Sequence, residues 1–454
     1  MQKKVLAALI GTLCAVPAFA QTNVTIYGIM DAGLHFGAGR AKLVSGIAEG
    51  SRLGFKGMED LGGGYKALFN IEARVELGTG KQVAGNISDY QGMALVRGFD
   101  SALVAATPAL FNAAAPTNAA ALRAAAYNAG VQVTNGFNRT IVNNANALFD
   151  RTSMVGLITP VGAVLGGRMY TPGYEILAAG DTFETGTAGG WGTLTGGSAG
   201  LLSAGVSIRS DNAVQYRIQT PAGISAAVMY GFRNSGYVGL DKKFYGANVK
   251  YKANGFDVGL GYNHGTDQIG RKGLVTWTIA GSYETGPMKF FAGYHNMENP
   301  NSVLVDEFVT RGWEPAVTPQ LTAALSALPA ALAAVRPAII DGYRAAFRNT
   351  LATNLKLDAV SWTLGMHYRL GAGRIMASYN SVNDKTAPNA DAAQYSIGFD
   401  YDLSKRTDIY TIASIVTNKN GAQYAPGAAS APGGFTKAPG EDGRAFQVGI
   451  RHRF

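Results

Sequence analysis

Histidine and serine are the side chains of this sequence best suited to nucleophilic or general-base chemistry, and their placement supports neither. The chain has five His, no pair of His or Cys shows metal-ligand spacing, and no phosphate-binding loop occurs. Ser361 and His367 fall on the same face of one expected strand, but they are six residues apart, which is roughly 20 Å along a strand. We therefore expect no enzymatic activity and predict no catalytic, cofactor or metal site.

The charged residues that recur on one side of successive segments are basic. Four arginines share this placement: Arg52, Arg74, Arg151 and Arg168. Arg168, for example, is expected to point away from Leu165 and Met169, whereas the parity of Arg151 is ambiguous. Any single arginine could merely solvate a wet surface, but arginines from successive segments argue for a shared basic wall. Further inward candidates are Arg217, Lys250, Arg369 and Arg374.

Composition restricts the class of protein that positions these side chains. The chain has 454 residues, of which 47% are hydrophobic and 15% charged, with 60 Gly, 21 Tyr and 20 Phe. The mean hydropathy of +0.05 indicates that polar residues are interspersed almost everywhere. Few charges and many aromatics disfavour intrinsic disorder, and dispersed apolar residues disfavour a helical membrane protein, which needs runs of about 20. A β-rich chain with half-apolar strands remains.

The first 20 residues have the pattern of an export signal. Two lysines precede an apolar run, and Ala-Phe-Ala at 18–20 is a small-x-small cleavage pattern. Cleavage after Ala20 would start the mature chain at Gln21 and, by removing both lysines, lower the formal net charge from +9 to +7. Cys14, the only cysteine, leaves with the signal, so we expect no disulfide and no thiolate chemistry. A basic exported protein suits anionic solutes or lipid headgroups better than nucleic acid.

From residue 24 onward, apolar residues recur at every second position, which is the period of a β-strand. The clearest example is 65–77, where one side is apolar and the other mostly polar or charged. Similar alternation occurs in 245–251, 256–262, 275–283, 360–370, 395–403 and 446–454. A soluble sandwich would also alternate, but these strands exceed the usual five or six residues. Aromatic residues gather at their ends, as in the girdles of a membrane barrel.

Short and long connections alternate between these segments. Short turns are expected at 59–63, 159–160, 221–223, 253–255, 285–287, 371–373 and 404–407, and long links at 37–48, 171–208, 233–242, 266–272, 383–389 and 418–442. This layout predicts an all-β fold, a transmembrane antiparallel β-barrel of about 16 strands with both termini on the short-turn side. Closure satisfies backbone groups that a sheet edge would leave unpaired in hydrocarbon.

Two Ala-rich stretches, 78–148 and 298–358, interrupt the strand pattern, and each replaces a long link of a single barrel at 21–454. Helix propensity favours helices in both, so we expect helical, extracellular loop insertions that cap the mouth. A flexible or self-packing spacer is the alternative. A membrane-spanning helix at 315–340 is disfavoured, because Arg336 and three prolines interrupt it.

Several segments resemble the Gram-negative porin family of β-proteobacteria. They are SRLGFKGMEDLGGGYKALFNIE at 51–72, VTIYGIMDAG at 24–33, GGRMY at 166–170, NAVQY at 212–216, LSKRTDIY at 403–410 and VGIRHRF at 448–454. The resemblance implies a trimer of sixteen-stranded, water-filled barrels in the outer membrane. It also implies that the third long loop, 171–208, folds into the pore and narrows it. The ending resembles the family's barrel assembly signal, with Phe446, Val448, Ile450 and Phe454 at alternate positions. The two insertions depart from the family, since they make this chain larger than usual members.

The candidate constriction loop is acidic. It has no Lys or Arg but contains Glu175, Asp181 and Glu184. A basic wall facing this loop would set up a transverse field across the narrowest section, and rings of fixed charge select ions by attracting counter-ions. Because the mature chain is basic, we expect a modest preference for anions, which the loop carboxylates could cancel or reverse.

Three functions remain open. The leading interpretation is passive diffusion of small hydrophilic solutes and ions, without a cofactor, through a homotrimer that contacts outer-membrane lipids and lipopolysaccharide. A substrate-selective channel for organic anions is the second. A plugged surface adhesin or structural barrel is the third, and no nucleic-acid partner is expected.

Overall fold

The computed structural model describes residues 23–37, 40–82, 91–135, 147–195, 207–236, 239–430 and 433–454. The predicted export signal at 1–20 lies outside these residues.

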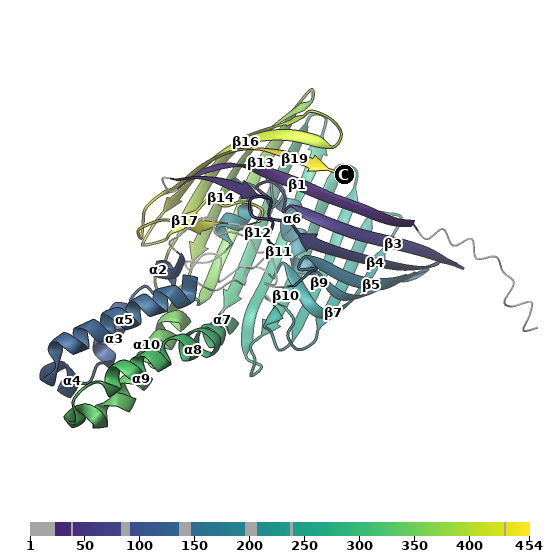
Figure 1. Ribbon diagram of the computed structural model, residues 1–454. Coiled ribbons are helices and arrows are strands. Elements are labelled where there is room, and N and C mark those ends of the chain that lie inside the picture. Colours follow the sequence, from purple (N-terminus) through teal and green to yellow (C-terminus); the bar gives the residue numbers. More distant parts are fainter. Residues whose placement is uncertain are drawn as a thin grey trace, which may run out of the picture.

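The long strands form one closed antiparallel barrel (Figure 1). They are β1 (Asn23–Gly37), β2 (Arg40–Ser45), β3 (Arg52–Gly62), β4 (Tyr65–Arg74), β5 (Thr152–Thr159), β6 (Gly162–Tyr170), β7 (Arg209–Gln219), β8 (Ile224–Gly231), β9 (Phe244–Ala253), β10 (Phe256–Thr266), β11 (Lys272–Thr285), β12 (Met288–Asn299), β13 (Leu357–Leu370), β14 (Gly373–Asp384), β15 (Ala392–Asp402), β16 (Thr407–Asn418) and β19 (Gly443–Arg453). Successive strands pair, and β1 pairs with β19 to close the sheet. β2 and β3 share one position, because they pair with 32–37 and 23–29 of β1. The barrel therefore has sixteen strand positions, which confirms the predicted fold class.

The alternation that predicted these strands is present in the structure. In β15, Tyr395 and Ile397 are exposed on the outer face, whereas the alternate residues Gln394 and Ser396 are buried on the inner face. The outer row is apolar because acyl chains surround it, and the inner row can be polar because it faces the lumen or the loops within it. The long connections share one end of the barrel, called here the long-loop end, and the short turns lie at the other, the short-turn end.

The expected long link at 37–48 is wrong. β1 continues to Gly37 and β2 begins at Arg40, and the irregular segment is 46–51, between β2 and β3. The side chain of Asp31 on β1 holds this segment, since its Oδ2 accepts the backbone N–H of Ala48 at 2.7 Å and of Glu49 at 2.6 Å. The bend carries Ala48 and Glu49 into the lining of an inner cavity.

Both Ala-rich stretches contain helices. The first has α2 (Gln91–Leu95), α3 (Phe99–Ala106), α4 (Ala109–Ala114) and α5 (Pro116–Asn135). The second has α7 (Val303–Glu307), the π-helical turn η4 (Phe308–Trp313), α8 (Glu314–Ala316), α9 (Thr318–Ser326), the 3₁₀ turn η5 (Ala330–Val335) and α10 (Arg336–Asn354). Within the described ranges, no helix combines the length and the apolar character needed to cross a bilayer.

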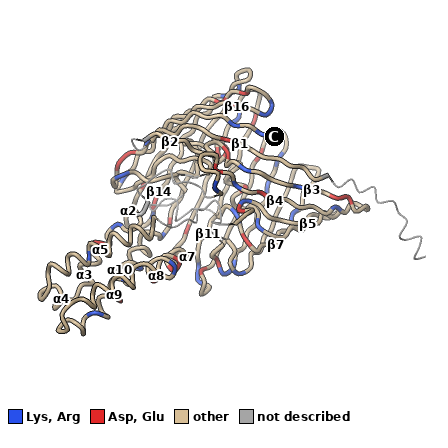
Figure 2. The backbone as a smooth tube through the Cα atoms, viewed as in Figure 1, with Lys and Arg blue, Asp and Glu red and all other residues tan. Residues whose placement is uncertain are grey.

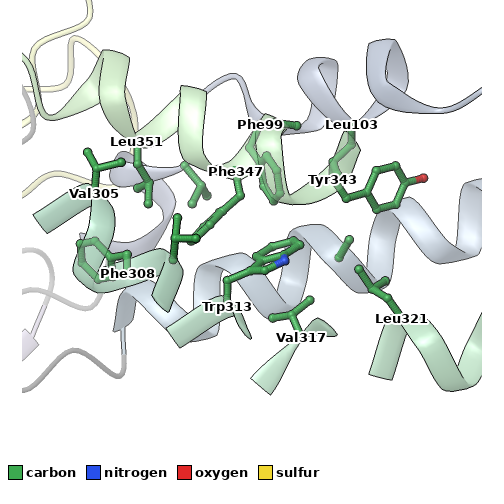
Figure 3. Packing of buried hydrophobic residues seen from close by; sticks show 14 of the residues in the cluster. Phe99, Leu103, Val305, Phe308, Trp313, Val317, Leu321, Tyr343, Phe347 and Leu351 are labelled. Atoms are coloured by element: carbon green, nitrogen blue, oxygen red, sulfur yellow. The ribbon is translucent and has the colours of Figure 1, made fainter. Parts of the chain in front are cut away.

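The two sets of helices pack into one bundle, the helical arm, which extends from the barrel in Figure 1. Figure 3 shows its core, where Phe99 of the first stretch lies against Trp313 and Phe347 of the second. The Trp313 and Phe347 rings stack with centroids 4.7 Å apart, and the Phe99 ring lies 5.4 Å from Phe347. Both stretches thus contribute to one shared core, with about twice as many buried residues from the second as from the first.

The arm joins opposite sides of the barrel rim. Its first half connects β4 to β5, the third and fourth strand positions, and its second half connects β12 to β13, the eleventh and twelfth of sixteen. The two connections are therefore half a circumference apart. The chain leaves the rim at two opposite points, and the bundle joins these two connections in one core.

Candidate pore constriction

The described part of the loop at 171–208, called here the lumen loop, packs against the inner face of the wall. Its helix α6 (Pro172–Gly180) contacts β9 to β12, and a 3₁₀ turn, η1 (Trp191–Leu194), follows. Thr171 caps α6 by accepting the N–H of Tyr174 at 3.3 Å. Asn263 on β10 donates to Thr171 Oγ1 at 3.0 Å and accepts the N–H of Gly173 at 3.0 Å. These bonds fix where the helix starts on the wall.

Polar residues of β13 anchor the rest of the lumen loop. The Trp191 indole N–H donates to Ser361 Oγ at 2.7 Å, and a ring nitrogen of His367 lies 2.6 Å from the carbonyl oxygen of Thr182. Ser361 and His367, the two residues weighed as a nucleophile and a base, each contact a different part of the loop. Their inward-facing side chains therefore hold the loop in place.

Asp181 organises the turn after α6. It is buried and its carboxylate accepts the backbone N–H of Phe183 and of Trp191, each at 2.9 Å. Burial raises the pKa of Asp181 to about 7, although these two N–H groups favour the charged form. The side chain therefore shapes the loop and does not face the open lumen.

The described part of the last long loop, residues 419–430 and 433–442, fills another part of the lumen. Its short strands β17 (Tyr424–Ala425) and β18 (Gly434–Phe435) pair with each other. Tyr424 packs with Leu194 of the lumen loop and with Val382 and Val416 of the wall in one apolar cluster. Together the two loops cover the inner face of β11 to β16, so the open space lies toward β3 to β7 and toward the short-turn end.

The first open space, the long-loop cavity, has a volume of about 130 Å³. Its charged lining consists of Arg52, Arg151, Arg209, Glu49 and Glu184. Arg52 pairs with Glu49 at 3.0 Å, and Arg209 donates to the Tyr170 hydroxyl at 2.7 Å. Three guanidinium groups from β3, β7 and the start of β5 thus meet at one level of the wall.

The second open space, the short-turn cavity, has a volume of about 220 Å³. Its charged lining consists of Arg369, Arg374, Arg451, Arg453, Glu184, Asp400 and Asp402. Glu184 also lines the first cavity and a small space of about 10 Å³ between the two, so it stands where the cavities meet. Arg374 donates to its carboxylate at 2.6 Å. Burial alone would raise the pKa of Glu184, but the positive charge of Arg374 outweighs burial and holds that pKa at about 2.

The structure brings together only part of the predicted basic wall. Arg52 and Arg151 line the long-loop cavity, but Arg74 and Arg168 do not. Arg74 is buried and pairs with Glu76 at 2.7 Å. Arg168 forms an ion pair with Asp211.

The expected orientation around Arg168 is also wrong. Leu165 and Met169 are buried on the inner side, and Val164 is exposed on the outer side. Register places Arg168 opposite Ser153, next to an irregularity between Gly167 and Met169. Apolar side chains face inward here because they pack in a cluster with Leu68, Met154, Ala213, Met229 and Phe244.

Of the three predicted loop carboxylates, only Glu184 lines the open space. Glu175 is held at the wall, where it pairs with Arg217 and accepts from Asn248 Nδ2 at 3.1 Å. Asp181 is in the loop core. The acidic loop facing a basic wall is therefore reduced to one carboxylate, and that carboxylate pairs with Arg374 on β14.

Sequence reasoning missed six charged residues of the lining: Glu49, Arg209, Asp400, Asp402, Arg451 and Arg453. The signal for two of them was present, because Arg451 and Arg453 alternate with the outward Ile450. Arg209 sits at the junction of loop and strand, where alternation has not yet begun. Glu49 lies in the bend that replaces the expected link.

The C-terminal residues occupy the seam of the barrel. Phe446, Val448 and Ile450 are exposed on the outer face of β19. Phe454 exchanges two backbone hydrogen bonds of 3.1 Å with Gly28 of β1. A Cβ on Gly28 would lie 2.6 Å from the backbone carbonyl oxygen of Arg52 and 2.4 Å from the Phe454 ring, so glycine is required for this close approach. The predicted role of these residues in barrel assembly stays a prediction.

Charged residues gather along the barrel and its rims, while the far part of the helical arm carries few (Figure 2). A sixteen-stranded barrel with an apolar outer face and a polar, charged inner passage defines a diffusion channel of the bacterial outer membrane. Residues 5–422 match the family described as Gram-negative porin. The chain belongs to the Gram-negative porin family, and it is an outer-membrane protein through which small hydrophilic solutes diffuse passively.

Individual relatives agree with this assignment. Outer membrane porin protein 32 of Delftia acidovorans is 24% identical over 466 residues, with all of both chains covered. The structure of an anion-selective porin from Comamonas acidovorans matches with a TM-score of 0.61 at 22% identity, over 96% of this chain and 100% of that one. OmpT of Vibrio cholerae, solved in a trimer form, matches with a TM-score of 0.53 at 13% identity, over 95% of this chain and 99% of that one.

Proposed function

We propose that this porin prefers anions modestly over cations. The observation that carries the proposal is the charge of the open space: among the described residues, the two cavities are lined by seven arginines and four carboxylates. A surplus of fixed positive charge attracts anions and repels cations in a confined passage. The relative from Comamonas acidovorans, named for anion selectivity, supports the same sign.

The placement of the loop carboxylates strengthens this expectation. Glu175 and Asp181 were expected to oppose the basic wall, but Glu175 pairs with Arg217 and Asp181 is buried in the loop. Of these three loop carboxylates only Glu184 lines the cavities, where it pairs with Arg374 and so offsets a single arginine charge. Cancellation of the arginine surplus by the loop is therefore small.

The reversal potential of the purified protein in a planar bilayer with a potassium chloride gradient tests the proposal. We expect a sign that corresponds to a chloride-to-potassium permeability ratio above one, and a ratio that approaches one as salt is raised and charges are screened. A ratio below one would overturn the assignment.

We further propose that the protein is a homotrimer, that the helical arm is extracellular and that the mature chain starts at Gln21. Support comes from the trimeric OmpT relative and from the shared position of the arm and the long loops. The apolar outer face would contact lipids, and the long-loop rim would contact lipopolysaccharide. Mass measurement in detergent, N-terminal sequencing and protease cleavage of the arm on intact cells test the three parts. A monomer, an uncleaved N-terminus or an arm resistant until cells are lysed would each reject its part.

The sequence also left open a plugged surface adhesin or structural barrel, which would not conduct ions. Conductance separates the two. Steady ionic steps from the reconstituted protein support the diffusion channel, and a protein that inserts without conducting supports the plugged barrel.

A further inference from the structure

We propose that the long-loop cavity is a binding site for small ring-bearing carboxylates, of which benzoate is the simplest. The inference rests on the proposed anion preference and deepens it by naming a class of solute. The site has an apolar and aromatic side, formed by Tyr170, Tyr174, Leu177 and Ile208, and a basic side, formed by Arg52, Arg151 and Arg209. Two carboxylates also line the cavity, Glu49, which pairs with Arg52, and Glu184, which pairs with Arg374.

The aromatic side is built by the junction of β6 and α6. Tyr170 ends β6 and Tyr174 lies one helical turn further on, so their rings stack with centroids 5.3 Å apart and planes 15° apart. Leu177 follows on the same helix, and Ile208 closes the loop. Ring stacking and apolar contact favour a flat, partly apolar solute over a fully hydrated ion.

The basic side converges on the same place. Arg209 lies over the Tyr170 ring at 4.3 Å from its centroid. Its guanidinium donates to the Tyr170 hydroxyl at 2.7 Å, and that of Arg151 donates to the same oxygen at 3.3 Å. Two guanidinium groups thus already converge on one oxygen next to an aromatic face. A carboxylate beside them would be recognised through paired N–H donors.

The short-turn cavity provides an internal contrast. It is larger, with about 220 Å³, and has four arginines, but its only uncharged lining residues are Ala372 and Gly373. It can attract any small anion without distinguishing a ring from a chain. The long-loop cavity, at about 130 Å³, is comparable with cavities of about 150 Å³ that hold benzene, and it opens into the passage.

The test is block of chloride current through the full-length protein by benzoate, compared with acetate and with cyclohexanecarboxylate. A stacking contribution predicts half-block by benzoate at a concentration roughly two- to tenfold lower than by acetate. Benzoate should also block the chloride current more strongly than cyclohexanecarboxylate, which has equal charge and similar bulk but no aromatic face. Equal block by all three would overturn the inference.

Variants locate the site. Tyr174→Leu should abolish the advantage of benzoate, while Tyr174→Phe, which keeps the ring and loses only the hydroxyl contact to Thr185 Oγ1 at 3.2 Å, should retain it. Tyr401→Leu, an exposed tyrosine on the outer face of β15, is the matched control and should retain it too. An advantage that survives Tyr174→Leu would overturn the inference. The reversal potential in chloride alone reports separately on the anion preference, so failure of the wider proposal is recognised independently.

Discussion

Neutralising Arg52 isolates the contribution of one lining charge to selectivity. Arg52 lines the long-loop cavity. Its partner Glu49 would not be left unpaired by the substitution, because Glu49 also pairs with Arg451 and Arg453. In water, the interaction energy between a unit charge and an ion about 7 Å away is ~0.6 kcal/mol. Screening in ~0.1 M salt halves this energy. Arg52→Gln therefore disfavours an anion by about 0.3 kcal/mol and favours a cation equally, so the permeability ratio falls roughly threefold.

The assay is the reversal potential of wild-type and Arg52→Gln protein under the same potassium chloride gradient. Arg348→Gln is the matched control, because Arg348 lies on the helical arm with a half-exposed side chain paired to Asp306 at 2.5 Å. We expect a shift toward cations for Arg52→Gln and none for Arg348→Gln. An unchanged ratio for Arg52→Gln, or an equal shift for both, would refute the assignment of selectivity to the cavity arginines.

Three further outcomes follow from the same geometry. Arg168→Gln should leave selectivity nearly unchanged but lower thermal stability, because Arg168 is paired with Asp211 away from the cavities; a selectivity shift as large as that of Arg52→Gln contradicts this. Burial raises the pKa of Asp181 from 3.8 to about 7 in the folded protein. The contribution of Asp181 to the free energy of unfolding is therefore complete below pH ~4 and is lost as the pH rises through ~7, a loss of up to about 4 kcal/mol. Unfolding or hydrogen exchange at pH 5 and pH 8 should show a weaker loop at pH 8, and Asp181→Asn should remove the difference. Trp313→Ala should destabilise the arm by about 3–5 kcal/mol without changing conductance, as measured by helical circular dichroism and bilayer recording; loss of the channel would show that barrel and arm fold as one unit.

The barrel could be predicted because its signal is local and repeated. The alternation in 65–77 or 395–403 depends only on which side of a strand meets lipid, and the observed strands β4 and β15 fall within or across these ranges. Closure and strand number follow from the alternation of short and long links. The conclusion is insensitive to an error of a few residues at any one strand end.

The same rule failed where apolar residues of neighbouring strands pack together on the inner face of the barrel. Leu165 and Met169 were assigned to the lipid because apolar residues usually face it, yet they pack inward in an apolar cluster. Strand parity near Arg168 is further disturbed by the irregularity between Gly167 and Met169. Inward packing of this kind depends on contacts between several strands of the wall, so the sequence of one strand does not reveal it.

The shared core of the arm could not be predicted from the sequence either. Each Ala-rich stretch predicts helices by propensity, but the contact of Phe99 with Trp313 and Phe347 joins residues more than 200 positions apart in the chain. Ala-rich helices have few large side chains, so their partner is specified by a handful of aromatic and leucine positions. Those positions would be apolar whether each stretch packed on itself or on the other, so the apolar pattern does not distinguish the two arrangements.

The shared core changes what the insertions mean for the channel. Two independent caps could move apart or be lost singly, because loops tolerate insertion at small entropic cost. Here each half buries the apolar face of the other, with Trp313 from one connection enclosed by Phe99 from the opposite side of the rim. Separation of the halves would expose both faces to water. The arm therefore ties opposite sides of the rim together, while the charged residues that line the two cavities belong to the barrel wall, its short connections and the lumen loop.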